Sequence, residues 1–508
     1  MLRALILLAV AGYIQAGTIQ GIVLEHASGR PLARSMVRLD PVPQSTGEKG
    51  HPLVLRVGLS GNFVFPGVAP GVYLLTATHA GYFPGAFGQR LPLGHAAPIE
   101  VTKDSTLFAE LRLRHQGAVT GRVLDENGVG TSGIPVVAYR ARLPLRSAGG
   151  ALSDDRGVFR IPGLEAGKYW VRSAAYTLVD GTGWLPTFGS VARETREARV
   201  HQVTFDNDTS DADISPEIGA LFRMGGIITC SAAGPLIVTL TSETGRRRIQ
   251  SECPLLTFQA AFHFEGLGPA VYEVFAALEN GAASGFTELY LDHDMNGVNF
   301  QAAPPPTVEF EVRHAGSNAT LDIPITLLGR RQDLAEVETE QEIRMPRTTL
   351  SPGHWEMRAR LPSGYYVESI GAQRGTPRRT WSVEHPPDWF EVYIDPRYAR
   401  VLISVADHAG QIAGKVTSDG KPSAGAPVFL WPVAESARRS LSGAVQTLTD
   451  TNGHYRFDSL PPGDYRVLSS FDVDEIDGDL IAQSQAPVIH VDASQTANMD
   501  LAVWTAPW

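Results

Sequence analysis

The sequence predicts an all-β protein, built from tandem immunoglobulin-like or prealbumin-like β-sandwich domains in an elongated array. One observation is that short segments alternate apolar and polar residues with period two, as half-buried strands do. A second is that these segments recur together with an aromatic hairpin block about every 100 residues. A third is that the 508 residues show almost no sustained helical periodicity. A repeat of this length, made of short strands, is typical of an immunoglobulin-like sandwich.

The N-terminal residues have the pattern of a secretory signal peptide. Arg3 supplies a positive charge, residues 4–14 are apolar, and Ala16 before Gly17 is an acceptable cleavage position. An apolar helix of this length rises about 16 Å, roughly half of a bilayer core. We therefore expect residues 1–16 to be a signal peptide and the rest of the chain, which has no further apolar stretch of about 18 residues, to be secreted or periplasmic.

Three segments share a pattern of alternating apolar residues around a central Gly. Each is followed by a turn and by a second strand-like segment. The pattern predicts the first strand of a domain, with one face in the core. The segments read GTIQGIV at 17–23, GAVTGRV at 117–123 and GQIAGKV at 410–416.

An aromatic hairpin block follows each of these first strands. It contains a turn Gly, an aromatic residue that opens a strand, a Pro/Gly or Ala/Gly turn, and a Tyr that opens the next strand. We expect positive φ at the turn glycines Gly157 and Gly453. Two degenerate copies of the block lie between the clear ones. The anchor aromatics are Tyr73, Tyr169, Tyr272, Trp355 and Tyr465, with spacings of 96, 103, 83 and 110 residues.

The strand pair and the hairpin together resemble the carboxypeptidase regulatory-like domain, a prealbumin-like or transthyretin-like sandwich of about seven strands. The hairpin reads TDTNGHYRFDSLPPGDYRV at 449–467. The resemblance is specific at 410–470, good at 17–82 and 117–175, and weak at 221–300 and 307–400. It implies a tandem array in a secreted bacterial protein. It does not imply peptidase activity.

The repeats divide the mature chain into five predicted sandwiches. Three are carboxypeptidase regulatory-like, the last being the clearest copy, and two are degenerate. Their expected ranges are 17–114, 115–217 and 406–508 for the clear copies, and 218–305 and 306–405 for the degenerate ones.

Composition and motifs argue against several classes of function. The net charge of -11 disfavours a general nucleic-acid binder, which is usually basic. None of the fourteen His begins the H-x-x-E motif of a metallocarboxypeptidase, and H-E-x-x-H is missing. No nucleophile elbow or phosphate-binding loop occurs either. The sequence predicts no catalytic residues, no enzymatic activity and no cofactor.

Two acidic stretches are weak calcium candidates. Asp292, Asp294 and Asn296 open like an EF-hand loop, but position twelve is Ala303 and no helix flanks the stretch. We therefore favour a hairpin turn at Asn296-Gly297. The second stretch, 472–479, contributes Asp472, Asp474 and Asp477, and a solvated loop is the favoured interpretation there.

The two cysteines and two tryptophans complete the candidate residues. Cys230 and Cys253 are expected to form a disulfide in an oxidising compartment, with Cα atoms within about 7 Å. Trp170 and Trp431 each follow an inward-facing residue, so both should face outward. Such exposed rings suit either a glycan platform or a contact between domains.

These features predict a non-enzymatic binding or surface-interaction protein. The alternatives are a carbohydrate-binding array that acts on polysaccharide and an accessory subunit of an envelope enzyme or transport system. The expected partner is a protein or polysaccharide at the cell envelope, and the expected state is a monomer.

Overall fold

The computed structural model describes residues 16–506 except 43–50, 91, 93, 142–144, 146, 179–181, 243–244, 318, 332–339, 374–387, 398 and 474. The expected signal peptide lies almost entirely outside this range. Within the described residues, no helix is both long enough and apolar enough to cross a bilayer.

The chain is all-β, as the sequence predicts, and folds into five successive β-sandwiches, here called domains 1 to 5. Domain 1 contains β1 (Gly17–Glu25), β2 (Met36–Pro41), β3 (Leu53–Arg56), β4 (Asn62–Val68), β5 (Gly71–Thr78), β6 (Gly85–Ala86), β7 (Ile99–Val101) and β8 (Thr106–Leu113). Domain 2 contains β9 (Gly117–Arg122), β10 (Pro135–Arg140), β11 (Ser147–Leu152), β12 (Val158–Leu164), β13 (Gly167–Ser173), β14 (Tyr176–Thr177), β15 (Thr182–Trp184), the 3₁₀ helix η1 (Thr195–Glu197), β16 (His201–Val203) and β17 (Asp208–Thr209).

The two degenerate copies form complete sandwiches as well. Domain 3 follows β18 (Ile218–Ala220) and contains β19 (Phe222–Cys230), β20 (Gly234–Ser242), β21 (Gly245–Cys253), β22 (Gln259–Leu267), β23 (Ala270–Leu278), β24 (Ser284–Leu291) and β25 (Phe300–Ala302). Domain 4 contains β26 (Thr307–His314), β27 (Thr326–Arg331), β28 (Gln341–Ile343), β29 (Arg347–Thr349), β30 (Gly353–Arg360), β31 (Tyr366–Ala372), β32 (Phe390–Ile394) and β33 (Ala399–Ala406).

Domain 5 adds two short helices to the sandwich. It contains β34 (Gly410–Ser418), β35 (Lys421–Pro422), β36 (Pro427–Pro432), α1 (Glu435–Leu441), β37 (Val445–Leu448), β38 (His454–Leu460), β39 (Gly463–Ser469), α2 (Gly478–Ser484), β40 (Val488–Val491), β41 (Thr496–Asn498) and β42 (Leu501–Ala502).

One strand arrangement recurs in every domain. The first strand pairs in parallel with the strand that ends the domain and antiparallel with a strand from the middle of the domain, as in the order β4-β1-β8. The second sheet is built around an antiparallel pair, β2 with β5 in domain 1 and β36 with β39 in domain 5. This shared topology gives each domain two facing sheets, and a separate cluster of buried apolar side chains lies within each domain.

The boundary between domains 2 and 3 differs slightly from the expected position. β18 lies after the expected boundary at 217/218, yet it pairs with β15 of domain 2. β33 pairs with β26 and completes domain 4, in agreement with the expected range of 306–405 to within one residue.

The five anchor aromatics make the same hydrogen bond, each to the backbone carbonyl four residues earlier. In domain 4, where Trp355 replaces the Tyr, its indole Nε1–H donates to the Ser351 carbonyl over 2.9 Å. A Tyr near the start of such a strand, bonded to an upstream carbonyl, is the tyrosine corner of β-sandwiches. The four Tyr bonds are Tyr73 to Ala69, Tyr169 to Glu165, Tyr272 to Gly268 and Tyr465 to Pro461.

The repeated glycines have two separate physical causes. Gly157 and Gly453 have φ of 77° and 80°, which confirms the predicted positive φ in the hairpin turn. The central Gly of the first strand is needed for space, because a Cβ on Gly414 would lie 1.7 Å from the Met499 carbonyl oxygen. The Met499 carbonyl can therefore approach the first strand this closely because Gly414 has no side chain.

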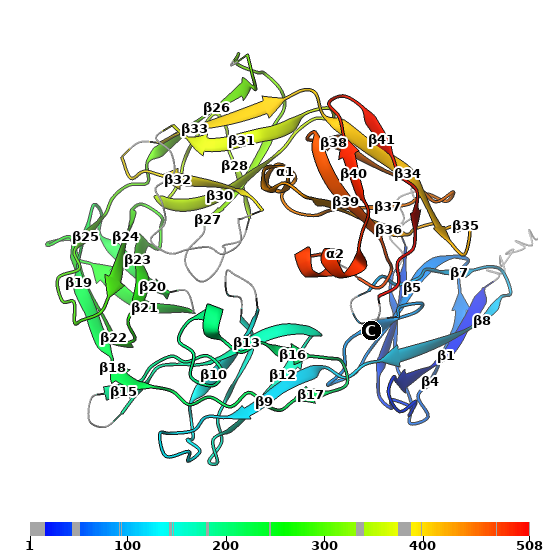
Figure 1. Cartoon of the computed structure of the whole chain (residues 1–508), viewed down its shortest axis with the longest axis horizontal. Coiled ribbons are helices and arrows are strands. Elements are labelled where there is room, and N and C mark those ends of the chain that lie inside the picture. Colours follow the sequence, from blue (N-terminus) through cyan, green and yellow to red (C-terminus); the bar gives the residue numbers. More distant parts are fainter. Residues whose placement is uncertain are drawn as a thin grey trace, which may run out of the picture.

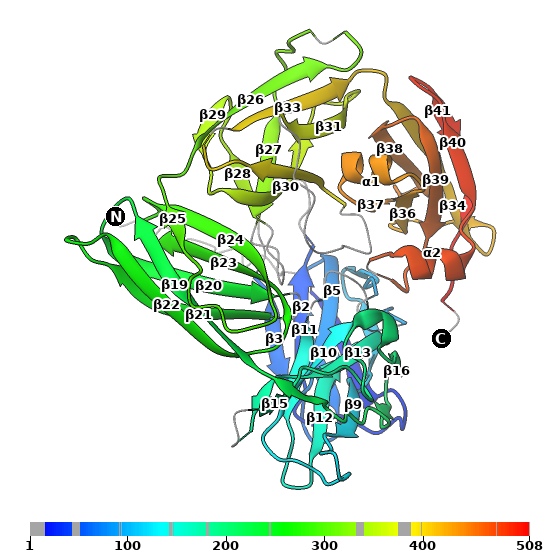
Figure 2. The ribbon, with the colours of Figure 1, turned by 60° about the vertical axis from the view of Figure 1, so that its left-hand side comes forward.

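The array curves in space, so that domain 5 returns to domains 1 and 2. Figure 1 shows the five sandwiches arranged around a common centre, with the sheet built on β1, β9, β19, β26 or β34 on the outside of each. Figure 2 shows the same arrangement turned, with α2 on the side of domain 5 that faces domains 1 and 2. We call this arrangement the ring.

Candidate functional site

The contact that closes the ring joins domain 5 to domain 1. Asp472 follows β39, and its Oδ2 accepts a hydrogen bond from Arg90 Nη1 over 3.0 Å. The Asp472 side chain is 2% exposed, whereas that of Arg90 is 55% exposed. Two more bonds cross the same contact, from the backbone N–H of His95 to the Phe471 carbonyl and between the Gln446 and His95 side chains. The closure therefore rests on a small set of polar contacts around one buried carboxylate.

The helix α2 brings a second acidic residue to domain 2. Asp477 precedes the helix, and its side chain accepts a hydrogen bond from the backbone N–H of Leu480 over 2.9 Å. This N-cap fixes the start of α2. Asp479, in the first turn, forms an exposed ion pair of 3.0 Å with Lys168 on β13 of domain 2.

The acidic stretch at 472–479 therefore contacts other parts of the protein rather than forming a solvated loop. Asp472 faces Arg90, Asp477 caps α2, and Asp474 lies outside the described residues. Asp472 and Asp477 thus each have hydrogen-bond partners within the protein. In the part of the chain that the structure describes, no three His, Cys, Asp or Glu side chains gather in a way that could hold a metal ion.

The stretch at 292–297 is a crossing between two sheets and not a hairpin. β24 before it pairs with β23, whereas β25 after it pairs in parallel with β19 in the other sheet, so the predicted hairpin at Asn296-Gly297 is wrong. Asp294 accepts the backbone N–H of Arg223 and Asp292 contacts His293, while Asn296 lies exposed between them and the next strand. Asp292 and Asp294 therefore each have a hydrogen-bond partner within domain 3.

The two candidate surface aromatics are covered by their own domains. Both face away from the main core, as predicted. Trp170 is nevertheless only 9% exposed, because it packs with Tyr139 and Phe188 under the loop that follows β15. Trp431 is half-buried against the small cluster that α2 completes, and Arg438 stacks over its ring at 5.6 Å. Of the two alternatives, the glycan platform therefore lacks the exposed ring of Trp170 and has only a half-buried ring at Trp431.

The two cysteines join the two sheets of domain 3. Cys230 ends β19 in one sheet and Cys253 ends β21 in the other. The structure places them in a disulfide with Cα atoms 6.3 Å apart, and both residues are buried. The bond links the two layers directly across the core.

A cavity of about 300 Å³ lies in domain 1, beside the contact that closes the ring. Three arginines and His26 line it, together with Pro84, Gly85, Gln89 and Pro92, and no acidic residue is part of the lining. The arginines come from two places: Arg90 lies in the loop after β6, Arg112 lies near the end of β8, and Arg114 directly follows that strand. We call this cavity the arginine pocket.

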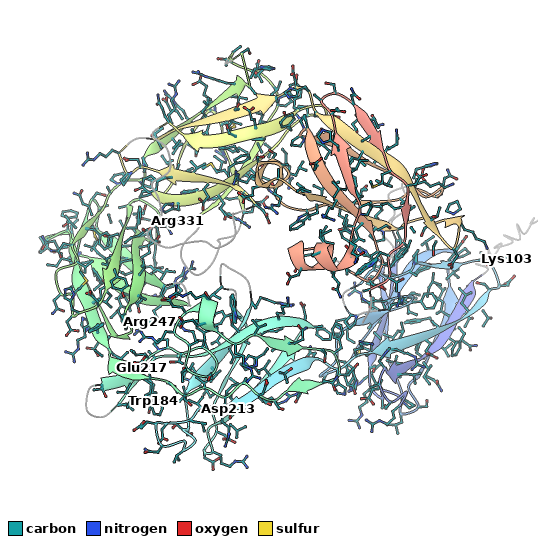
Figure 3. All side chains as sticks on the ribbon, in the orientation of Figure 1. Lys103, Trp184, Asp213, Glu217, Arg247 and Arg331 are labelled. Atoms are coloured by element: carbon teal, nitrogen blue, oxygen red, sulfur yellow. A yellow bond between two sulfur atoms is a disulfide. The ribbon has the colours of Figure 1, made fainter. Side chains whose placement is uncertain are left out.

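A buried ion pair joins domains 3 and 4. Arg331, at the end of β27, donates to Glu273 of β23 over 3.0 Å, and the two side chains are 3% and 0% exposed. The Arg331 guanidinium also lies 4.0 Å from the centre of the Phe275 ring. Figure 3 shows Arg331 on the side of domain 4 that faces domain 3. This pair favours one orientation between the two domains, because a different packing that kept both side chains buried but broke their contact would leave two unpaired buried charges.

Neither the closing contact nor the arginine pocket is visible in the sequence. Their residues are single arginines and aspartates that lie far apart in the chain and belong to no repeated motif. The one available signal is the density of carboxylates at 472–479, which is unusual in a domain whose other copies lack it.

No family model matches the chain, and no curated protein sequence matches it. The solved structures similar to it include the minor pilin GBS52 of Streptococcus agalactiae, with 13% identity over 40% of this chain and 95% of that one and a TM-score of 0.26. The shaft pilin SpaA of Lactobacillus rhamnosus GG has 12% identity over 40% and 96%, with a TM-score of 0.21. BcpA, the major pilin subunit of Bacillus cereus, has 10% identity over 76% and 99%, with a TM-score of 0.14. Similarity this low carries no conclusion about function.

Proposed function

We propose that this protein is a non-catalytic, extracytoplasmic interaction scaffold, which holds five β-sandwiches in a fixed ring and presents them together to a partner at the cell envelope. The observation that carries the proposal is the contact between Asp472 and Arg90. A chain of sandwiches that only needed reach would gain nothing from joining its last domain to its first. A binding surface shared by several domains gains directly, because fixing the domains beforehand lowers the entropy cost of contacting them all at once.

The disulfide in domain 3 and the N-terminal signal pattern support the compartment. Structural disulfides persist in oxidising compartments and are rare in the cytosol. A family relationship to carboxypeptidase regulatory-like domains fits the same picture and remains a proposal from the sequence motifs. Polysaccharide binding is not part of the proposal, since Trp170 is buried and Trp431 is half-buried.

The test compares the mature protein with a double variant, Arg90→Glu and Lys168→Glu, that places like charges at both closing ion pairs. Small-angle scattering should show a larger maximum dimension for the variant, while its circular dichroism stays that of a β-protein. Co-sedimentation with isolated cell envelopes should fall several-fold in the variant. A matched control is Arg456→Glu with Arg196→Glu, which changes the same charge at exposed surface ion pairs away from the closing contact.

Two results would contradict the proposal. Equal envelope binding by the closed and opened forms would show that one domain is enough. Steady turnover of a substrate by the purified protein would show that the protein is an enzyme.

A further inference from the structure

We propose that the arginine pocket of domain 1 is a binding site for a small organic anion with one carboxylate or phosphate group, of about the size of a monosaccharide. All residues that line the pocket belong to domain 1, and the inference does not depend on the proposed role of the ring. It rests on the lining of the pocket, on one buried donor and on the state of one histidine.

The lining brings three guanidinium groups to one cavity without an acidic residue among them. Each arginine has one carboxylate neighbour outside the lining: Asp472 for Arg90, Glu110 for Arg112 and Asp206 for Arg114. Such a neighbour orients a guanidinium but uses few of its five N–H donors. A bound oxyanion would take donors from more than one arginine, in the bidentate geometry that guanidinium and oxyanions share.

Arg114 shows most clearly that a partner would be favourable. Its Nε is buried and has no hydrogen-bond partner among the described residues, and the nearest carboxylate oxygen, on Asp206, lies 3.8 Å away. A buried donor without an acceptor costs free energy, and a ligand oxygen that reached this nitrogen would recover it. The Arg114 guanidinium also stacks on Phe205, with its carbon 5.4 Å from the centre of the ring. This contact limits the movement of the Arg114 side chain.

His26 lies partly buried in the pocket, beside the charges of Arg114 and Arg112. Arg114 Nη2 lies 3.0 Å from His26 Nε2, and because arginine only donates, this nitrogen accepts and the ring is neutral. Burial lowers the pKa of His26, and the charges of Arg114 and Arg112 lower it further, against a smaller opposite effect of Asp206. An anion between these arginines would cancel part of that field and raise the pKa of His26.

The size and walls of the pocket indicate an organic ligand. About 300 Å³ is at the lower end of the range for small-molecule sites and exceeds the volume of a single inorganic anion. Pro84 and Pro92 add apolar ring surface to the lining, which suits a carbon skeleton beside the charged group.

The test is calorimetry and NMR on the mature protein with four probes: glucuronate, glucose 6-phosphate, inorganic phosphate and glucose. We expect glucuronate or glucose 6-phosphate to bind, to raise the pKa of His26 in the NMR titration, and to bind at least tenfold more tightly than inorganic phosphate or glucose. The two binding probes distinguish a carboxylate ligand from a phosphate ligand.

The variants Arg112→Gln and Arg114→Gln should each weaken binding at least tenfold. The matched control is Arg38→Gln, because Arg38 pairs with Asp40 two residues away on a strand of the same domain, as Arg112 pairs with Glu110, but lies outside the pocket. Arg114 also contacts domain 2, so Arg112→Gln keeps the test decisive if the Arg114 variant folds poorly. Glucose binding as tight as glucuronate and glucose 6-phosphate, phosphate binding as tight as glucose 6-phosphate, or binding unchanged by Arg112→Gln would each overturn the assignment.

Discussion

Asp472 and Arg90 lie 382 residues apart in the sequence, and their side chains meet at 3.0 Å. The carboxylate is buried and also accepts the backbone N–H of Ala506, near the end of the chain. One side chain thus holds the last segment of domain 5 and a loop of domain 1 together.

Replacing the buried Asp472 should lower the stability of domain 5 much more than replacing Asp479, whose carboxylate is exposed. Asp472→Asn should lower the free energy of unfolding of domain 5 by about 1–3 kcal/mol, because a buried charged hydrogen bond is lost. Asp479→Asn should change it by less than about 0.5 kcal/mol, since its ion pair with Lys168 is exposed. Urea unfolding of both variants measures the difference, and equal effects would contradict the role given to burial.

The space requirement at the first strand predicts a severe effect of one added methyl group. Gly414→Ala should destabilise domain 5 by more than about 3 kcal/mol, because the new Cβ collides with the Met499 carbonyl and the Tyr455 ring. Gly371→Ala in β31 is the matched control, since a Cβ added there would approach no atom of the described residues, beyond its chain neighbours, within 4 Å. Thermal unfolding should separate the two variants clearly, and similar midpoints would remove the argument.

The repeated corner bond should contribute most where it is buried. Tyr465→Phe removes the hydroxyl that donates to Pro461 and should cost about 1–2 kcal/mol. Tyr73→Phe removes the equivalent bond to Ala69 at a more exposed corner and should cost less. Denaturant unfolding of the two variants tests this order, which a larger effect at Tyr73 would reverse.

Acid should weaken the hairpin turns of domains 2 and 5. Backbone N–H groups of Val158 and His454 hold the pKa of Asp154 and Asp450 below the ordinary value. A lowered pKa stabilises the fold above about pH 4, the unfolded value, and this stabilisation is lost as the pH falls through the folded pKa. Wild type should therefore exceed the Asp450→Asn variant in stability at pH 6 and approach it near pH 2.5.

Domain 1 offers an internal control for this pH effect. Its turn makes the same backbone bond, from Gly61 to the carbonyl of Gly58, but has no carboxylate at that position. Its local stability, followed by hydrogen exchange of the turn amides, should not show the acid transition of the other two turns.

Domain 5 should fold alone. Residues 406–508 contain the complete core around Ile412, Val428 and Tyr465. The segment with α2 covers the face of the second sheet that points away from this core. We expect a cooperative melt and a β-type circular dichroism spectrum. A fragment that folds only with residues 306–405 attached would show that domains 4 and 5 share one core.

The sequence predicts the parts of this fold that depend on local chemistry. Alternating residues such as Ile412, Gly414 and Val416 identify a first strand, and the turn Gly453 with Tyr465 identifies the hairpin and its corner. Both features depend on residues close together in the chain, so they are repeated wherever the domain is repeated. Domain 4 shows that even Trp355 can take the place of Tyr when it donates the same bond.

The curvature of the array and the arginine pocket could not be predicted in this way. These features depend on single long-range contacts without periodicity, such as the pairs Arg331 with Glu273 and Arg90 with Asp472. Trp170 illustrates the same limit, because the alternation correctly gives the direction of its ring but not the loop that covers it.

The parallel pairing of the first and last strands has a mechanical consequence. A pull on the two ends of a domain draws β1 and β8, or β26 and β33, in opposite directions along their length. The hydrogen bonds between them are then loaded in shear, all at the same time, instead of opening one after another. The contact between Asp472 and Arg90 has no such ladder behind it. Under tension the ring should open at that contact first. The chain should then lengthen as the curved row of five folded domains becomes straight, before any one domain unfolds.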